Sequence, residues 1–178
     1  MIFCEGETEV GYFSAFRKKA KLISGGNALK IVENAVAFKN SGEKKYDQYW
    51  VVFDKDDTTN LQFEQAIQLA RTNGIRVAWS NQAFECWIIL HFRDFTYACH
   101  RNEYEALLKK FIPEYDASQK GHEQGRQLYK NTRPLLPSAI ERARDGYASF
   151  PPHLPEAQKQ TSTILYELME IILSQPLQ

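Results

Sequence analysis

The chain of 178 residues lacks the long apolar segments and the cysteine spacing that mark membrane proteins and secreted proteins. No stretch approaches the roughly 18 apolar residues of a membrane-spanning helix, and the N-terminus lacks a basic region followed by an apolar core. The three cysteines, Cys4, Cys86 and Cys99, show no CxxC spacing. We therefore expect a soluble, cytoplasmic protein with reduced thiols and no membrane contact.

The chain also lacks an excess of charge of either sign. Basic and acidic residues number 22 each, so the overall positive field of a DNA-coating protein is absent. Contact with nucleic acid must therefore come from local groups. His100, His122 and His153 have no metal-ligand spacing, which argues against a zinc site. His91 lies in an apolar run, and we expect it to be a hydrogen-bonded core residue.

Length and composition predict a single folded unit. The 43 % hydrophobic and 25 % charged residues fall in the globular range. A chain of 178 residues can bury a sizeable core but is short for two full domains. We expect one domain over residues 1–178, with a sheet-containing core over about 1–92 and a helical remainder over 93–178.

Apolar runs alternate with helical patterns in the first half of the chain. The expected strands are 1–4, 49–53 and 75–79, with a minor strand near 22–24. The expected helices are 9–21 behind a Thr8 cap, 27–42 between an Asn27 cap and a Gly42 stop, and 61–72, with a turn at Gly25-Gly26. This alternation implies right-handed crossovers and a largely parallel sheet.

From Phe84 onward the pattern is helical only. The expected helices there are 84–92, 103–111, 123–130, 135–144 and 161–173. The sheet is therefore confined to the first half. The predicted fold class is α/β, with a mostly parallel central sheet flanked by helices and an all-helical C-terminal half packed on it.

Acidic residues follow two of the predicted strands. Glu5 and Glu9 follow the first strand, and Asp54, Asp56 and Asp57 follow the strand that ends near residue 53. In open α/β sheets, ligands bind beyond the carboxyl ends of the strands. Glu5, Asp54 and Asp56 come within reach of one another if these strands are neighbours. Clustered carboxylates repel unless a hard cation neutralises them, so the sequence predicts a magnesium site.

Other interpretations of the second acidic segment stay open at this point. Asp56 or Asp57 could cap a helix that starts after Thr58. The segment also fits the first motif of haloacid-dehalogenase-like phosphatases, in which Asp54 would be the nucleophile. That class needs a later lysine and a paired acidic strand end, which are not evident, and it leaves Glu5 unexplained.

Three segments resemble the RloB-like family in sequence and in order. They are Cys4-Glu5-Gly6-Glu7-Thr8-Glu9 with Tyr12-Phe13, Val52-Phe53-Asp54-Lys55-Asp56, and Ser80-Asn81-Gln82-Ala83-Phe84-Glu85-Cys86-Trp87 continuing to Phe92. The tail from Gln160 to Thr163 resembles the family's Asn-Pro-Ser-Thr segment, with Gln-Thr in place of Asn-Pro. A strand ending in Glu-Gly, followed by a strand ending in Asp-x-Asp, is similar to the toprim fold. That fold is shared by topoisomerases, primases and overcoming-lysogenization-defect nucleases.

The resemblance implies a toprim-like, metal-dependent nuclease of bacterial defence or abortive infection. By this resemblance Glu5 would be the general acid or base, and Asp54 and Asp56 would hold Mg²⁺ or Mn²⁺. Glu9 and Glu85 would join a second cation. Glu85 lies in an otherwise apolar run, where a buried charge needs a cation or hydrogen bonds; capping of a helix N-terminus is its simpler role.

The implied partners are nucleic acid, either DNA or RNA, and other proteins of a defence system. Lys120 and Arg126 could contact phosphate from a loop and a helix start, although an exposed helix entry explains them equally well. The alternative function is a non-catalytic toprim module that binds a nucleotide, nucleic acid or a protein partner in a defence complex.

Overall fold

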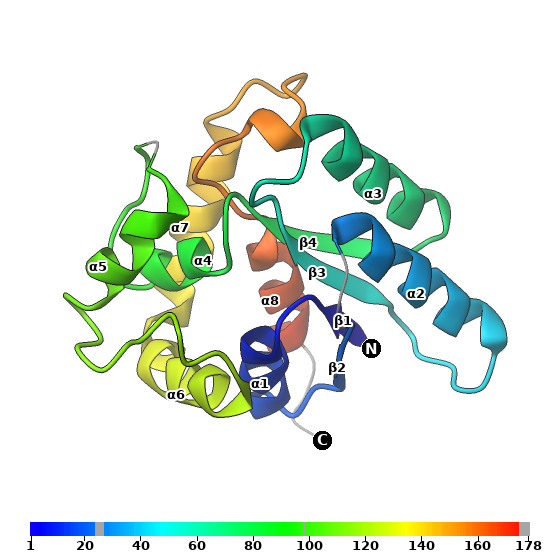
Figure 1. Cartoon of the computed structure of the whole chain (residues 1–178), viewed down its shortest axis with the longest axis horizontal. Coiled ribbons are helices and arrows are strands. Elements are labelled where there is room, and N and C mark those ends of the chain that lie inside the picture. The colour runs from blue at the N-terminus through cyan, green and yellow to red at the C-terminus, as the bar shows by residue number, and fades with distance from the viewer. Residues whose placement is uncertain (24–26, 98, 175–178) are drawn as a thin grey trace.

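A parallel sheet of four strands lies at the centre of the N-terminal half (Figure 1). The computed structural model describes residues 1–23, 27–97 and 99–174. The strands are β1 (Ile2–Cys4), β2 (Ala20–Leu22), β3 (Trp50–Asp54) and β4 (Arg76–Ser80), in the order β2-β1-β3-β4. The predicted α/β class, with a parallel sheet in the first half, is confirmed.

Helices connect the strands and cover both faces of the sheet. They are α1 (Glu7–Ala15), α2 (Ala28–Ser41) and α3 (Asn60–Thr72). Right-handed crossovers, the general rule for parallel strands, imply that α2 and α3 cover one face of the sheet and α1 the other. Helices α2 and α3 are in contact, and Figure 1 shows them side by side. Because both faces are covered, β3 is apolar up to its last residue, Asp54, and Val51, Val52 and Phe53 are buried.

The C-terminal half is helical and packs on the sheet half. Its elements are α4 (Glu85–Leu90), η1 (Arg101–Glu103), α5 (Tyr104–Leu108), α6 (His122–Thr132), η2 (Arg133–Leu135), α7 (Leu136–Ala148), η3 (Glu156–Gln158) and α8 (Leu165–Ser174). Helix α6 packs on α1, and α8 packs on β4 and α7. Among the described residues, no helix is long and apolar enough to cross a membrane.

Helix α6 approaches α1 closely because both helices carry a glycine at the crossing. A Cβ at Gly125 would lie 2.0 Å from the Thr8 carbonyl oxygen, and a Cβ at Gly11 would lie 2.2 Å from the His122 carbonyl oxygen. No larger side chain fits at either position without moving a backbone. These two glycines therefore bring the helical half against the start of α1, beside the acidic residues.

The ends of α2 were predicted correctly. The Asn27 side chain accepts a hydrogen bond from the backbone N–H of Lys30 at 3.1 Å. Gly42 ends the helix with φ of 68°, a left-handed conformation that glycine adopts without strain. The predicted turn at Gly25-Gly26 lies outside the described residues.

The prediction for α1 was wrong at both ends. The helix starts at Glu7 with Gly6 as its N-cap, so Thr8 lies inside it and is not the cap. The Thr8 hydroxyl instead donates to Gln124 at 3.2 Å. The helix ends at Ala15, because the chain turns near Arg17, with φ of 59°, and β2 then pairs with β1 from residue 20 onward. Tertiary pairing overrides the helical pattern there.

Helix α8 also starts later than predicted, at Leu165. Thr163 first pairs with Ser80 in an isolated antiparallel bridge at the end of β4. Its hydroxyl donates to the Trp79 carbonyl oxygen at 2.9 Å and accepts from the backbone N–H of Leu165 at 3.1 Å. The segment from Gln160 to Thr163, which resembles the family's Asn-Pro-Ser-Thr segment, therefore contacts β4 through Thr163, and α8 begins only after this contact.

Candidate functional site

Glu5 and Asp54 meet at the carboxyl ends of two neighbouring parallel strands. The register pairs Cys4 with Val52, so Glu5, the residue after β1, lies beside the C-terminal end of β3. The backbone N–H of Glu5 donates to the Val52 carbonyl oxygen at 3.2 Å. The backbone N–H of Asp54 donates to the Glu5 carboxylate at 3.1 Å. The adjacency on which the predicted site depends is thus present.

Glu9 adds a third carboxylate from the first turn of α1. Its residue is only 6 % exposed. Gly6 makes room for it, because a Cβ at that position would lie 2.3 Å from Glu9 Oε2. The pKa of Glu9 is raised to about 7. Burial is the largest cause, the negative charges of Glu85 and Glu5 act in the same direction, and a backbone hydrogen bond and the charge of Lys120 oppose the rise.

Asp54 interacts with the same carboxylates. Burial raises the pKa of Asp54 well above its usual range, and the charges of Glu9, Glu5 and Glu85 add to this shift. The backbone N–H of Phe84 acts in the opposite direction. Negative charges are therefore brought together here at an energetic cost.

The pKa of Glu5 is raised less strongly, since several groups oppose one another around it. Burial is the largest cause and raises the pKa, and the hydrogen bond from Asp54 lowers it. The charge of Asp56 raises it again, whereas Lys120 and Arg101 lower it. The effect of an acidic neighbour on the pKa of Glu5 is therefore opposed by the effects of two cationic neighbours.

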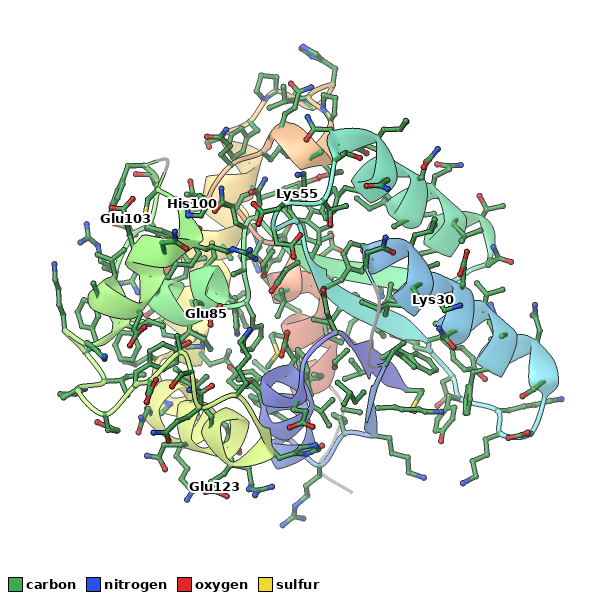
Figure 2. The ribbon with its side chains drawn as sticks, viewed as in Figure 1. Lys30, Lys55, Glu85, His100, Glu103 and Glu123 are labelled. Atoms are coloured by element: carbon green, nitrogen blue, oxygen red, sulfur yellow. The ribbon has the colours of Figure 1, made fainter. Side chains whose placement is uncertain are left out.

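Glu85, labelled in Figure 2, is the first residue of α4. Its charge raises the pKa of both Glu9 and Asp54, so it belongs with them. Its carboxylate accepts a hydrogen bond of 2.6 Å from the Tyr115 hydroxyl. No cap hydrogen bond from a side chain is made at the start of α4. We call Glu5, Glu9, Asp54 and Glu85 the carboxylate group.

Asp56 lies at the rim of this group. Its Oδ1 accepts hydrogen bonds from the backbone N–H of Thr58 at 2.9 Å and from the Thr58 hydroxyl at 3.0 Å. Arg101 lies 3.6 Å from its other oxygen. The helix that follows is capped by Thr59, so neither Asp56 nor Asp57 is its N-cap. Asp56 instead closes the turn after β3.

The donor set of the carboxylate group suits a hard cation, because Mg²⁺ and Mn²⁺ prefer carboxylate oxygens. Within the described part of the chain, no lysine or arginine forms an ion pair with any member of the group. Equally, no three histidine, cysteine, aspartate or glutamate side chains among the described residues are arranged as a ready set of metal ligands. The residues could therefore hold a metal ion only after their side chains converge on it.

The two predicted phosphate contacts have different surroundings. Lys120 is exposed, and its charge lowers the pKa of both Glu5 and Glu9. Arg126 is paired with Glu123 at 2.6 Å on the surface of α6. Lys120 thus acts on the carboxylate group, while no such link is seen for Arg126 in the described structure.

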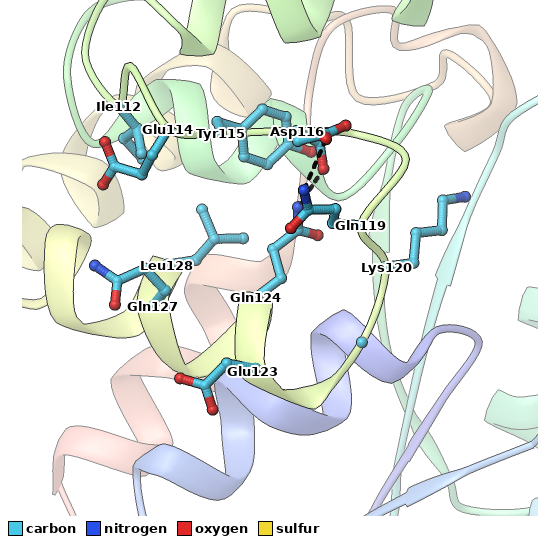
Figure 3. A pocket seen from close by; sticks show the side chains of 11 residues that line it. Ile112, Glu114, Tyr115, Asp116, Gln119, Lys120, Glu123, Gln124, Gln127 and Leu128 are labelled. Atoms are coloured by element: carbon cyan, nitrogen blue, oxygen red, sulfur yellow. Dashed lines mark hydrogen bonds between the residues drawn. The ribbon is translucent and has the colours of Figure 1, made fainter.

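A pocket of about 490 Å³ lies between α6 and the segment that precedes it, and none of the four carboxylates lines it (Figure 3). Tyr115 and Lys120 belong both to its lining and to the surroundings of the group. Leu128 and Ile112 supply apolar surface, and glutamine side chains supply amides. Figure 3 shows Lys120 pointing away from the other lining residues.

Sequence patterns gave no signal for Tyr115 or Arg101. Tyr115 reaches Glu85 across 30 residues of chain, and Arg101 reaches Asp57 across 44. Such contacts depend on the packing of the helical half and have no local pattern. By contrast, the apolar setting of Glu85 was a usable signal and did identify a member of the group.

Comparison with known proteins places the chain in a family without naming an activity. Neither the curated proteins nor the solved structures contain a match. A model of the RloB-like protein family matches residues 1–172, which is most of the chain. The chain therefore belongs to the RloB-like family.

Proposed function

We propose that this protein is a metal-dependent nuclease that hydrolyses phosphodiester bonds of DNA or RNA. One observation carries the proposal: the carboxylates of Glu5, Glu9, Asp54 and Glu85 lie near the carboxyl ends of β1 and β3, and among the described residues none of them forms an ion pair with a lysine or arginine. This is the edge of an open α/β sheet at which ligands bind.

The electrostatics favour a cation as the missing partner. Burial and mutual repulsion raise the pKa values of Glu5, Glu9 and Asp54, which means that their ionised forms are disfavoured without compensation. A divalent cation would remove this penalty. Oxygen donors of this kind, completed by water and substrate phosphate, are typical of Mg²⁺ and Mn²⁺ sites.

The residues then take distinct roles. Asp54, Asp56, Glu9 and Glu85 would hold the metal ion or ions. A bound metal would polarise the phosphodiester and lower the pKa of water. Glu5 is held by the Asp54 backbone and lies between acidic and cationic neighbours, so it can also move a proton to or from the reacting oxygen. These are the roles that the resemblance to the toprim fold implies for the same residues.

A cleavage panel tests this proposal. Single- and double-stranded DNA and RNA are incubated with the full chain and Mg²⁺ or Mn²⁺. Asp54→Asn and Glu5→Gln should each reduce cleavage by about a hundredfold or more. Glu33→Gln, on the exposed surface of α2, is the matched control and should leave the rate unchanged. No cleavage of any substrate by the wild-type protein would overturn the nuclease proposal.

The second candidate is a non-catalytic module that binds a nucleotide, nucleic acid or a protein partner. The finding that favours it is that the described side chains do not form a ready set of three metal ligands. Calorimetric titration with Mg²⁺ and Mn²⁺ separates the two proposals. Binding of metal together with cleavage supports the enzyme, whereas binding of nucleic acid without metal uptake or cleavage supports the module.

A role in bacterial defence or abortive infection completes the proposal and is supported by the family resemblance. It predicts that cells expressing the protein with its genomic neighbours resist phage infection. Plaque counts should return to the level of unprotected cells with Asp54→Asn. Equal protection by this variant would separate the defence role from the carboxylate group.

A further inference from the structure

Arg101 is held at the mouth of the carboxylate group by its backbone. Its backbone N–H donates to the Gln82 side-chain oxygen at 2.9 Å. The Gln82 carbonyl oxygen in turn accepts from the backbone N–H of Asp56 at 2.9 Å. Gln82 therefore connects the start of η1 to the turn that carries Asp56 and Asp57.

The guanidinium of Arg101 forms ion pairs with two acidic residues at the rim. It lies 2.6 Å from Asp57 and 3.6 Å from Asp56. The Arg101 side chain is 38 % exposed and that of Asp57 is 76 % exposed. An ion pair this exposed contributes only about 0 to 1 kcal/mol. The backbone of Arg101 is thus fixed, while its side chain can exchange partners at little cost.

Lys55 is nearer in sequence but is not available for the same task. Its side chain is buried, and its Nζ donates to the Thr58 carbonyl oxygen and lies 6.0 Å from the centre of the Phe63 ring. It therefore stabilises the turn after β3. Arg101 instead presents its positive charge to solvent at the rim.

We propose that Arg101 binds a phosphate group of the nucleic-acid substrate at the mouth of the carboxylate group, and that Asp57 is its resting partner, which competes with the phosphate. The inference rests on the proposed action on nucleic acid. A guanidinium suits this task because its planar fork donates two hydrogen bonds to phosphate. It also offsets the repulsion that the carboxylates exert on a phosphate.

The test is a double-mutant cycle on binding, measured without metal. Affinity of the full chain for fluorescein-labelled single-stranded DNA and RNA oligonucleotides is measured in EDTA at several salt concentrations. Arg101→Gln should weaken binding about tenfold and reduce the salt slope by about 0.7. Arg101→Lys should recover part of the loss. Asp57→Asn should strengthen binding, since it releases the guanidinium.

The cycle distinguishes competition at Arg101 from a general charge effect. In the Arg101→Gln background, Asp57→Asn should no longer strengthen binding. The matched controls are Arg144→Gln and Glu170→Gln, which break an exposed ion pair between α7 and α8 and should leave the affinity unchanged. Melting curves should show that all variants are folded, because these side chains are on the surface.

Three results would overturn the inference: no binding by the wild type at low salt, no loss with Arg101→Gln, or an equal gain from Asp57→Asn with and without Arg101. Each is independent of cleavage. If the cycle behaves as expected but no substrate is cleaved, the phosphate site stands and the nuclease proposal fails. If cleavage occurs and Arg101→Gln binds normally, the nuclease proposal stands and the phosphate site is wrong.

Discussion

The backbone N–H of Asp54 donates a hydrogen bond of 3.1 Å to the carboxylate of Glu5. This bond joins the residue after β1 to the last residue of β3. It fixes the Glu5 carboxylate beside the end of the neighbouring strand without using the Asp54 side chain. The Asp54 carboxylate takes no part in this bond, and its pKa is raised well above the usual range first by burial and then by the charges of Glu9, Glu5 and Glu85.

Asp54→Asn should make the metal-free protein more stable at pH 8. The substitution removes a buried charge that is repelled by its neighbours, so the free energy of unfolding should rise by about 1 kcal/mol. Saturating Mg²⁺ should raise the melting temperature of the wild type but not that of the variant. Urea unfolding in EDTA, and melting curves with and without Mg²⁺, provide the measurement. A variant that is less stable in EDTA and still responds to Mg²⁺ would contradict this expectation.

Gly6→Ala should separate activity from stability. The new Cβ would lie 2.3 Å from Glu9 Oε2, the movable end of a side chain, so the glutamate is displaced while the backbone stays in place. Gly6 has φ of −116° and ψ of 156°, which alanine also adopts. We expect the free energy of unfolding to change by less than about 1 kcal/mol. Metal affinity and the rate of cleavage should fall about tenfold or more. Unchanged metal affinity would show that Glu9 is not a ligand.

Gly125→Ala should destabilise the protein strongly. Its Cβ would lie 2.0 Å from the Thr8 carbonyl oxygen and 2.5 Å from the Tyr12 backbone nitrogen, neither of which can move without shifting a helix. The expected loss is about 2 to 3 kcal/mol. Gly146→Ala in α7 is the matched control, because a Cβ there meets nothing within 4 Å and alanine favours a helix by up to about 1 kcal/mol. Urea unfolding should give opposite signs for the two variants.

The buried side chain of His91 should make the free energy of unfolding depend on pH in the acid range. Burial lowers the pKa of His91 to about 4, and its Nδ1 lies 3.0 Å from the Trp87 carbonyl oxygen. The unfolded chain takes up a proton below about pH 6.5, whereas the folded chain does so only near pH 4, so the stabilisation is complete above pH 6.5 and is lost as pH falls towards 4. The loss should be on the order of 3 kcal/mol.

His91→Gln should flatten this part of the stability profile. Glutamine cannot titrate, but its amide can still donate to the Trp87 carbonyl oxygen. The difference in free energy of unfolding between wild type and variant, measured by urea at pH 4 to 7, should shrink as pH falls. A constant difference across this range would mean that His91 does not titrate differently in the folded and unfolded states.

The sequence determined β1, β3 and β4, the caps of α2 and the acidic residues that follow β1 and β3. These features are local: apolar runs predict buried strands, and Asn27 and Gly42 have the side chains that helix ends need. The meeting of Glu5 with Asp54 was predicted only on the condition that their strands are neighbours, and the order of the strands in the sheet meets that condition. The apolar setting of Glu85 identified another member of the group.

Only the tertiary structure decided the rest. Thr8 was expected to cap a helix, but α6 packs on α1 and uses the hydroxyl for Gln124. The contacts of Tyr115 with Glu85 and of Arg101 with Asp57 join residues far apart in the chain, which no periodicity encodes. The physical reason is that a local pattern specifies a preferred backbone conformation and a buried face. The partner of that face, and the charges gathered beside it, depend on long-range packing.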